Sequence, residues 1–414
     1  MSTAYHLKEE STVFERSPFV GGLSASKVVD GYTFDYGPHI FYTRSDYINQ
    51  MLDGFLAGNL IRHKREAYIF TGGAYVKYPF EANLHPLEKG VIDECIEGVK
   101  NRRQKGAGNF KEWILETFGE GIAKHYMVPY NQKIWKYDLS KMNLDWIAGR
   151  VPSPSVEEME KGARGEVKKE FGPNAFFQYA RKGGIGALAD AFVPRVKNLR
   201  KNCSVTRVKP LNDGVELVAS EEGVEKKTRF KKVFSSAPLP ELVKIVEGAP
   251  QEVTKAAESL VFNSLVCVNL GVKREKISDK HWLYFPEEKY VFNRISFPMN
   301  FSPETTPKGR SSILTEVTYR EKQPDFEKTK EKVVSGLVDT GILKEDDGLE
   351  VADVTQFDYA YVIYDLNHKK NVSVIHSFLK ENNIIPIGRF GEWEYLNMDK
   401  SILSGKKAAE EESK

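Results

Sequence analysis

An acidic residue followed by a glycine pair stands near the start of the chain. Glu15 ends the apolar run Thr12–Phe14, and Gly21 and Gly22 follow six residues later. A carboxylate at a strand end can hold both hydroxyls of a ribose, and glycines let backbone N–H groups approach a pyrophosphate where a Cβ would clash. Arg16 could add a positive charge beside the same phosphates. The pattern indicates the second half of a dinucleotide-binding unit; the alternatives are an exposed acid that ends a strand and a solvated arginine.

A histidine in a turn is the second candidate. In the text "YGPHIF", Gly37 and Pro38 give the turn signal and His39 follows. An imidazole can donate or accept a hydrogen bond near neutral pH and can tune the electronics of a ring bound beside it. The alternative is a histidine satisfied within its own turn. We expect Gly37 and Pro38 to be architectural.

A third group stands near the end of the chain. Gly388 follows the apolar run "IIPI", where a glycine permits close approach to a ligand, and Arg389 can meet a phosphate or a polar ring edge. Asn397, Met398 and Asp399 begin the last predicted helix, whose N–H groups and positive dipole end favour an anion or an electron-rich ligand. Ordinary helix capping by Asn397 or Asp399 is the alternative and is compatible with ligand contact.

Aromatic residues are dense in the middle of the chain. At such density aromatic side chains usually pack in a core, but a flat substrate would need some of them as a stacking surface. We assign this second role to Trp135 and Tyr179. The set comprises Trp135, Tyr137, Trp146, Phe176, Phe177 and Tyr179.

The composition argues against several classes of function. The chain has 414 residues with 60 basic and 58 acidic side chains, and this balance does not indicate nucleic acid as a partner. Cys95, Cys203 and Cys267 stand far apart, and the eight histidines show no metal-ligand spacing. We therefore expect no metal site, no disulfide framework and a cytoplasmic location. Because no apolar run approaches the length of a membrane span, we expect no membrane segment.

Local patterns predict the elements that position these residues. Helices are expected over residues 1–10, from Ser45, over most of 88–146 and from about Met398. The text from Ser153 to Pro173 reads as a connection. Strands are expected in a hairpin around 67–80, in a meander from Cys203 that closes on "VFSS", and at 264–272, 282–286, 290–297, 311–319 and 382–387. This order predicts domains built from separated segments.

Four islands of sequence carry a family resemblance. They are "VFERSPFVGGLSAS", "YGPHIFYTRSD", "YNQKIWKYDLSKMNLDWIAGRVP" and "IGRFGEWEYLNMDKSILSG". In this order they resemble flavoproteins of the amine oxidase superfamily, which share the fold of monoamine oxidase, protoporphyrinogen oxidase and UDP-galactopyranose mutase. The resemblance covers nearly the whole chain. It implies an α/β protein with a discontinuous Rossmann-like FAD-binding domain and an inserted α+β substrate domain that contains an antiparallel sheet and a helical block.

The resemblance also implies the cofactor and the roles of individual residues. FAD would lie in a domain formed by residues 1–80, 181–250 and 380–410, and the substrate in one formed by 81–180 and 251–379. His39 would lie beside the flavin ring. Candidate catalytic residues are His39 and Arg294, and candidate substrate residues are Trp135, Tyr179 and Arg294. Candidate cofactor-binding residues are Glu15, Arg16, Gly21, Gly22, Leu23, Ser24, Gly37, Pro38, His39, Val208, Gly388, Arg389, Asn397, Met398 and Asp399.

Two enzyme activities fit this resemblance. The leading one is oxidation of a small organic substrate, such as a planar aromatic molecule, by hydride transfer to the flavin, because no side chain stands out as an obligatory general base. The other is a mutase that acts on a nucleotide sugar with reduced flavin, which "YGPHIF" and "RVP" favour. Against the mutase, the resemblance calls for a second arginine shortly after "RVP", where this sequence has Ser153 and Pro154. Arg294 is the candidate substitute.

The family pattern places one further feature before the first helix. A strand and a GxGxxG loop would directly precede the text "STAYHLKE", which begins at Ser2. In such folds this loop holds the pyrophosphate. We expect the natural start to lie upstream of Met1; the alternative is a shortened, flavin-free protein without enzymatic activity.

Overall fold

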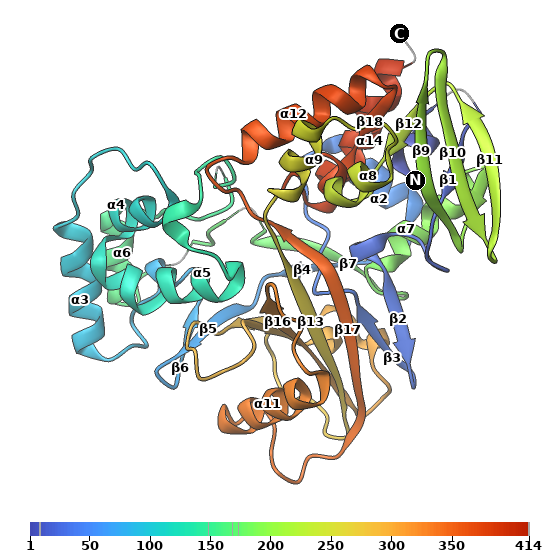
Figure 1. Ribbon diagram of the computed structural model, residues 1–414. Helices are drawn as coiled ribbons and strands as arrows, with labels where there is room; N and C mark the ends of the chain where they lie inside the picture. Colours follow the sequence, from blue (N-terminus) through green and yellow to red (C-terminus); the bar gives the residue numbers. More distant parts are fainter. Residues whose placement is uncertain (8–9, 148, 168, 173, 413–414) are drawn as a thin grey trace.

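The chain folds into three parts that pack against one another. The computed structural model describes residues 1–7, 10–147, 149–167, 169–172 and 174–412. Figure 1 shows a helical part, a sheet part, and a third part that holds both ends of the chain. The predicted mixed α/β class is confirmed. Within the described ranges, no helix has the length and apolar character needed to cross a membrane.

The sheet part is built on seven strands in the order β17-β13-β16-β15-β14-β5-β6. All neighbouring strands are antiparallel except β14 and β5. One face packs on helix α11, whose Val333 and Leu337 share an apolar cluster with Val266, Ile295 and Ile313. The elements are β5 (Ala67–Thr71), β6 (Ala74–Lys77), β13 (Phe262–Val272), β14 (Trp282–Tyr284), β15 (Arg294–Ser296), α10 (Pro298–Phe301), η6 (Pro303–Thr305), β16 (Ser311–Tyr319), α11 (Phe326–Asp339) and β17 (Leu349–Val362).

The third part contains two short parallel strand pairs. β1 (Thr12–Phe14) pairs with β8 (Asn198–Arg200), and β12 (Val233–Ser235) pairs with β18 (Ile384–Pro386). The first and last helices pack together, and Ser2 Oγ donates a hydrogen bond to the carbonyl of Ile402. The helices are α1 (Ser2–His6), η1 (Gly22–Ser24), α2 (Asp46–Phe55), α7 (Gly186–Phe192), η5 (Val193–Arg195), α8 (Leu239–Ile245), α9 (Gln251–Glu258), α12 (His368–Glu381), α13 (Gly388–Gly391) and α14 (Met398–Glu412).

Three further antiparallel units complete the fold. The meander consists of β9 (Cys203–Leu211), β10 (Gly214–Glu221) and β11 (Val224–Phe230). The expectation that "VFSS" closes the meander is wrong: these residues form β12, which leaves the meander to pair in parallel with β18. The other two units are the hairpin β2 (Ser26–Val29) with β3 (Tyr32–Asp35), and the pair β4 (Leu60–Lys64) with β7 (Phe176–Ala180).

The helical part depends on close contact between two helices. A Cβ on Gly121 would lie 2.3 Å from the carbonyl oxygen of Glu94, so a larger residue would force α3 and α4 apart. The helices of this part are η2 (Phe80–Ala82), α3 (Lys89–Lys100), α4 (Phe110–Ile122), the π-helical turn η3 (Ala123–Met127), α5 (Val128–Trp135), η4 (Leu139–Lys141) and α6 (Val156–Ala163).

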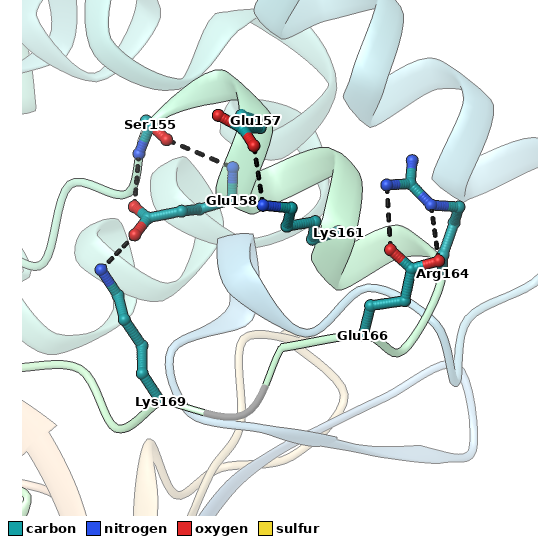
Figure 2. A network of polar contacts seen from close by, with 7 residues as sticks. All are labelled: Ser155, Glu157, Glu158, Lys161, Arg164, Glu166 and Lys169. Carbon is teal, nitrogen blue, oxygen red and sulfur yellow. Dashed lines mark hydrogen bonds and ion pairs between the residues drawn. The ribbon is translucent and has the colours of Figure 1, made fainter.

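Helix α6 begins with a capping box. Figure 2 shows Ser155 Oγ accepting from the Glu158 N–H at 3.2 Å, and the Glu158 carboxylate accepting from the Ser155 N–H at 2.9 Å. Such a reciprocal pair satisfies two backbone donors at the helix start. Lys169 donates to the same Glu158, and Arg164 forms two hydrogen bonds with Glu166, each 3.0 Å long. The contact between Lys169 and Glu158 ties the connection that follows α6 back to the start of that helix.

Three elements differ from the expectations drawn from sequence. The text from Ser153 to Pro173 contains helix α6 as well as a connection, and β17 was not expected because acidic residues interrupt its apolar alternation. The helix expected over residues 1–10 ends at His6, and residues 8–9 lie outside the described ranges. The division into two domains stays a prediction. At its boundaries, β5 and β6 lie in the central sheet, and α12 packs on α9 and β18.

Candidate functional site

Three aromatic side chains from different parts of the molecule meet in one cluster. Trp135 ends α5, Tyr361 lies near the end of β17, and Tyr395 lies between α13 and α14. Their ring centroids are 5.9 Å apart for Trp135 and Tyr361, 6.1 Å for Trp135 and Tyr395, and 5.9 Å for Tyr361 and Tyr395. We call Trp135, Tyr361 and Tyr395 the aromatic cluster. It lies where the helical, sheet and third parts join.

Two asparagines fix the orientation of this cluster. The Trp135 Nε1–H donates to Asn131 Oδ1 at 3.1 Å, one turn back on α5. Asn263, which is fully buried on β13, donates to the carbonyls of Ile134 and Trp135 and accepts from the Tyr361 N–H at 3.1 Å. Asn263 therefore links the end of α5 to β17, so Trp135 and Tyr361 cannot move independently.

Three arginines surround the aromatic cluster. The guanidinium carbon of Arg389 lies 4.5 Å from the Tyr395 ring centroid, and that of Arg150 lies 5.3 Å from it. Arg150 also donates to the Tyr395 carbonyl at 2.7 Å. The third arginine, Arg294 of β15, reaches the cluster through Glu316, which lies 3.4 Å from the Tyr361 hydroxyl. Cations beside aromatic faces suit a ligand that carries both an anionic group and a flat ring.

Arg294 forms an ion pair through two of its three guanidinium nitrogens. Its Nε and Nη2 both donate to Glu316, a carboxylate that is 1% exposed. Burial alone would lower the pKa of Arg294, but the fields of Glu316 and Tyr361 outweigh it and raise that pKa well above its ordinary value. Arg294 is therefore permanently charged. Its Nη1 makes no hydrogen bond to any residue in the described ranges, so this donor is available to a ligand.

His39 lies close enough to two of these arginines to feel their charges. Burial, with a smaller contribution from the charges of Arg389 and Arg294, lowers the pKa of His39 to about 4. The ring is therefore neutral at pH 7. Its Nδ1 lies 2.9 Å from the Gly37 carbonyl, which can only accept, so Nδ1 carries the proton and Nε2 is an acceptor. The turn satisfies one ring nitrogen and leaves the other for a ligand.

The residues of the first island lie together at the end of β1. One Glu15 oxygen accepts from the Ser17 N–H at 2.8 Å, and the other has no hydrogen bond within the described residues. Arg16 is exposed, and Leu23 and Ser24 lie in the turn η1. Gly21 has φ +100°, and a Cβ there would lie 2.7 Å from the Cβ of Ala189. Gly22, with φ +56°, has open space beside it, and Val208 is buried in the neighbouring β9.

The residues of the last island form a cradle with an unfilled side. Gly388 is buried and has φ +67°, yet a Cβ built on it would meet no atom within 4 Å. Beside it, Arg389 donates to the carbonyls of Leu396 and Ala360, while its buried Nε has no partner among the described residues. A buried donor without a partner is costly. Open space and an orphaned donor are what a flavin with polar ring edges would fill, so these residues fit such a cofactor.

The acidic and amide residues at the start of α14 have different roles. Asp399 accepts from Thr43 Oγ1 at 2.9 Å and from the Lys400 N–H at 2.8 Å. Its carboxylate is therefore already engaged within the protein. The Asn397 side chain is exposed, and Met398 is the first residue of the helix as expected. Contact of Asn397 and Met398 with a cofactor stays a prediction.

Tyr179 is not brought to the aromatic cluster. It is 1% exposed on β7, and its hydroxyl donates to the buried carboxylate of Asp35 at 2.7 Å. Asp35 also accepts from Ser26 Oγ and the Ile185 N–H, and burial raises its pKa to about 6. Tyr179 therefore holds β7 to β3, and we no longer expect it to contact substrate. The aromatic set divides accordingly: Phe177 and Tyr179 pack near Phe301, while Trp135 and Trp146 pack together.

Sequence analysis missed several members of this site. Arg150 is the arginine of the quoted "RVP", and Tyr395 lies in "GEWEYLNM". Their positions inside these motifs were the signal that could have identified them. Tyr361 and Glu316 gave no signal, because nothing local distinguishes them from strand residues. Among the described residues, no group of three His, Cys, Asp or Glu side chains is placed to hold a metal ion.

The sequence as a whole matches a family of flavoproteins. Residues 1–411 match the family described as flavin containing amine oxidoreductase, and the chain belongs to this family. Its structure is similar to one titled reduced UDP-galactopyranose mutase, with a TM-score of 0.93, 23% identity, and coverage of 99% of this chain and 91% of that one.

Other solved structures share the fold less closely. A putative protoporphyrinogen oxidase from Exiguobacterium sp. 255-15 matches with a TM-score of 0.75, 13% identity and coverage of 99% and 95% of the two chains. A putrescine oxidase bound to putrescine matches with a TM-score of 0.65, 13% identity and coverage of 100% and 96%. The predicted superfamily is confirmed, and its members include both oxidases and a mutase.

The cradle at Gly388 makes a testable prediction about flavin binding. Alanine at Gly388 should weaken flavin affinity by roughly tenfold or more, because a methyl group would occupy the open side of the cradle. Gly58→Ala is the matched control, since Gly58 also has a positive φ and open space but lies exposed in a loop. Both changes should strain the backbone by about 1–2 kcal/mol. Flavin fluorescence titration and thermal melts separate the effects, and equal affinity in both variants would contradict the cradle.

Proposed function

We propose that this protein binds FAD and changes the ring size of the sugar in a nucleoside diphosphate sugar, without net oxidation. The observation that supports this proposal most is the set of three arginines, Arg150, Arg294 and Arg389, around an aromatic cluster with one buried carboxylate, Glu316. A diphosphate needs at least two cations where water is excluded, and a nucleotide base needs a flat stacking partner.

The same observation answers the main objection to a mutase. The sequence lacks an arginine shortly after "RVP", but Arg150 and Arg389 both lie beside the Tyr395 ring, and Arg294 is linked through Glu316 to Tyr361, which stacks on Tyr395. Oxidation of a small organic substrate, which we favoured from sequence, would leave the charges of Arg150 and Arg389 without a counterpart if that substrate carried no anionic group. The likeness to a structure titled UDP-galactopyranose mutase supports the same choice.

The residues have distinct proposed roles. Glu15, Gly21 and Gly22 would hold the nucleotide half of FAD, and Gly388, Arg389 and neutral His39 would border its ring. When bound in reduced form, the flavin supplies the nucleophile for a sugar rearrangement. The free Nη1 of Arg294 and the Arg150 guanidinium would bind the diphosphate, and Trp135 would order the substrate. His39 Nε2 would accept a hydrogen bond from a donor group of the flavin ring and so orient that ring.

Ligand binding and product analysis test the proposal. Uridine diphosphate should bind the FAD-loaded protein in calorimetric titration, and Arg150→Ala should weaken it about ten- to a hundredfold, since a charge-assisted contact contributes about 1.5–3 kcal/mol. Arg195→Ala is the matched control, because Arg195 also lies over a ring, that of Phe55, and donates to a carbonyl. Dithionite-reduced protein should convert at least one of a panel of nucleotide sugars to an isomer with a different ring size, detected by chromatography.

The opposite result is equally clear. Hydrogen peroxide release from an amine or aromatic substrate, with no isomer from any nucleotide sugar, would overturn the mutase and favour an oxidase. Failure of uridine diphosphate to bind would contradict the role given to the arginines.

A further inference from the structure

We infer that Tyr364 is a positioning residue for the proposed site, because its hydroxyl holds in place the loop that carries Tyr395. The identity of the ligand rests on the proposed function, but the positioning does not. We call residues 392–397, between α13 and α14, the Tyr395 loop. Tyr364 follows β17 and is 3% exposed.

The hydroxyl of Tyr364 makes two hydrogen bonds to this loop. It accepts from the Tyr395 N–H at 2.7 Å and donates to the carboxylate of Glu394. The Tyr364 ring stacks on that of His368, with centroids 4.1 Å apart and planes inclined by 19°. His368 in turn bonds through Nε2 to the Trp393 carbonyl at 2.9 Å. Two side chains from the region after β17 thus hold three consecutive residues of the loop.

The loop needs such support because its backbone is strained. Trp393 has φ +57°, a left-handed conformation that a bulky residue rarely adopts, and it is completely buried. A residue in this conformation costs about 1–3 kcal/mol and persists only where the surrounding structure fixes it. Without the contacts of Tyr364 and His368, the loop would relax toward a conformation with a different Tyr395 position.

The far end of Tyr395 faces the proposed site. Its carbonyl accepts from Arg150, and its ring lies near the guanidinium groups of Arg150 and Arg389 and stacks on Tyr361. The Tyr364 hydroxyl therefore fixes the amide end of a residue whose carbonyl and ring order two of the three arginines. Tyr364 thus acts on the proposed site through Tyr395. Separately, Tyr364, His368 and Glu394 line a surface groove of about 510 Å³ beside α12.

Removal of a single hydroxyl tests this inference. Tyr364→Phe keeps the ring and its stack on His368 but removes both hydrogen bonds to the loop. Tyr359→Phe is the matched control, because the hydroxyl of Tyr359, on β17 itself, also donates to a glutamate, Glu241, at 2.6 Å. Glu394→Gln is a second variant that keeps the bond from the Tyr395 N–H to Tyr364.

The measurements are amide hydrogen exchange of the Tyr395 loop and calorimetric titration with uridine diphosphate. In Tyr364→Phe we expect exchange in the loop to accelerate at least tenfold and the dissociation constant to rise about tenfold. We expect Tyr359→Phe and Glu394→Gln to stay within about twofold of the unmodified protein in both measurements. A merely structural hydroxyl would lower the melting temperature in Tyr364→Phe without a selective effect on this loop.

Three results would overturn the inference: unchanged loop exchange in Tyr364→Phe, faster exchange with unchanged affinity, or an equal loss of affinity in Glu394→Gln. If the unmodified protein does not bind uridine diphosphate, the proposed function fails. The exchange comparison between Tyr364→Phe and Tyr359→Phe then still decides whether Tyr364 holds the loop.

Discussion

Replacement of Arg294 by alanine should lower the free energy of unfolding by about 3–5 kcal/mol. Arg294 provides both ion-pair contacts of Glu316, and Glu316 is 1% exposed, so the substitution would leave a buried carboxylate without its cation. Urea unfolding followed by circular dichroism measures the loss. The matched control is Arg310→Ala, which breaks an arginine–glutamate pair at the surface, where Arg310 Nε donates to both oxygens of Glu350, and should cost about 0–1 kcal/mol.

A double substitution separates the pair from the rest of the core. Arg294→Met combined with Glu316→Gln removes both charges, so it should recover most of the stability that Arg294→Ala loses. It should not recover ligand binding, because the free Nη1 donor of Arg294 would still be absent. If Arg294→Ala cost no more than Arg310→Ala, the buried ion pair of Arg294 and Glu316 would not stabilise the fold around the site.

The free energy of unfolding of the unmodified protein should fall, relative to that of the Glu81→Gln variant, as pH rises from about 5 to 9. Glu81 is 2% exposed in η2, and burial raises its pKa from 4.5 to about 8. The folded protein therefore keeps a proton that the unfolded chain loses, so folding weakens with pH between these values and levels off above the folded pKa. This difference corresponds to roughly 5 kcal/mol.

The comparison with glutamine isolates this one group. Glutamine keeps the shape of the side chain and cannot titrate, so the two proteins should have similar unfolding free energies near pH 5 and differ most near pH 9. Urea unfolding at several pH values measures both. Parallel pH profiles for the unmodified protein and the Glu81→Gln variant would show that Glu81 ionises without cost, through solvent or a partner that it gains at high pH.

Features set by neighbouring residues were the ones that sequence could predict. The helix expected from Ser45 is α2, with Ser45 as its N-cap; the pair Gly72–Gly73 turns the hairpin between β5 and β6, and α14 begins at Met398. Each depends on a few consecutive residues whose backbone preferences are strong. Gly388 and Arg389 became candidates for the same reason, since a glycine after an apolar strand is a local signal, and their role in binding stays a proposal.

Features set by distant residues could not be predicted in this way. Arg150 and Tyr395 share a hydrogen bond across 245 residues of sequence, and Glu316 joins the site only because β15 and β16 pair. β17 forms along β13 although Glu350, Asp353 and Asp358 interrupt its pattern. Tyr179 was misassigned because an aromatic residue carries no local sign of the carboxylate, here Asp35, that its hydroxyl will meet.

The packing of the first helix on the last one has a consequence for how the protein is made. Ser2 contacts Ile402 across 400 residues, and the strand pairs β1–β8 and β12–β18 also join distant segments. On the ribosome, the helical and sheet parts can form from chain that has already emerged, whereas α1 must wait for α14. The part proposed to hold the flavin is therefore the last to close, and a nascent chain exposes its apolar strand edges for most of its synthesis time.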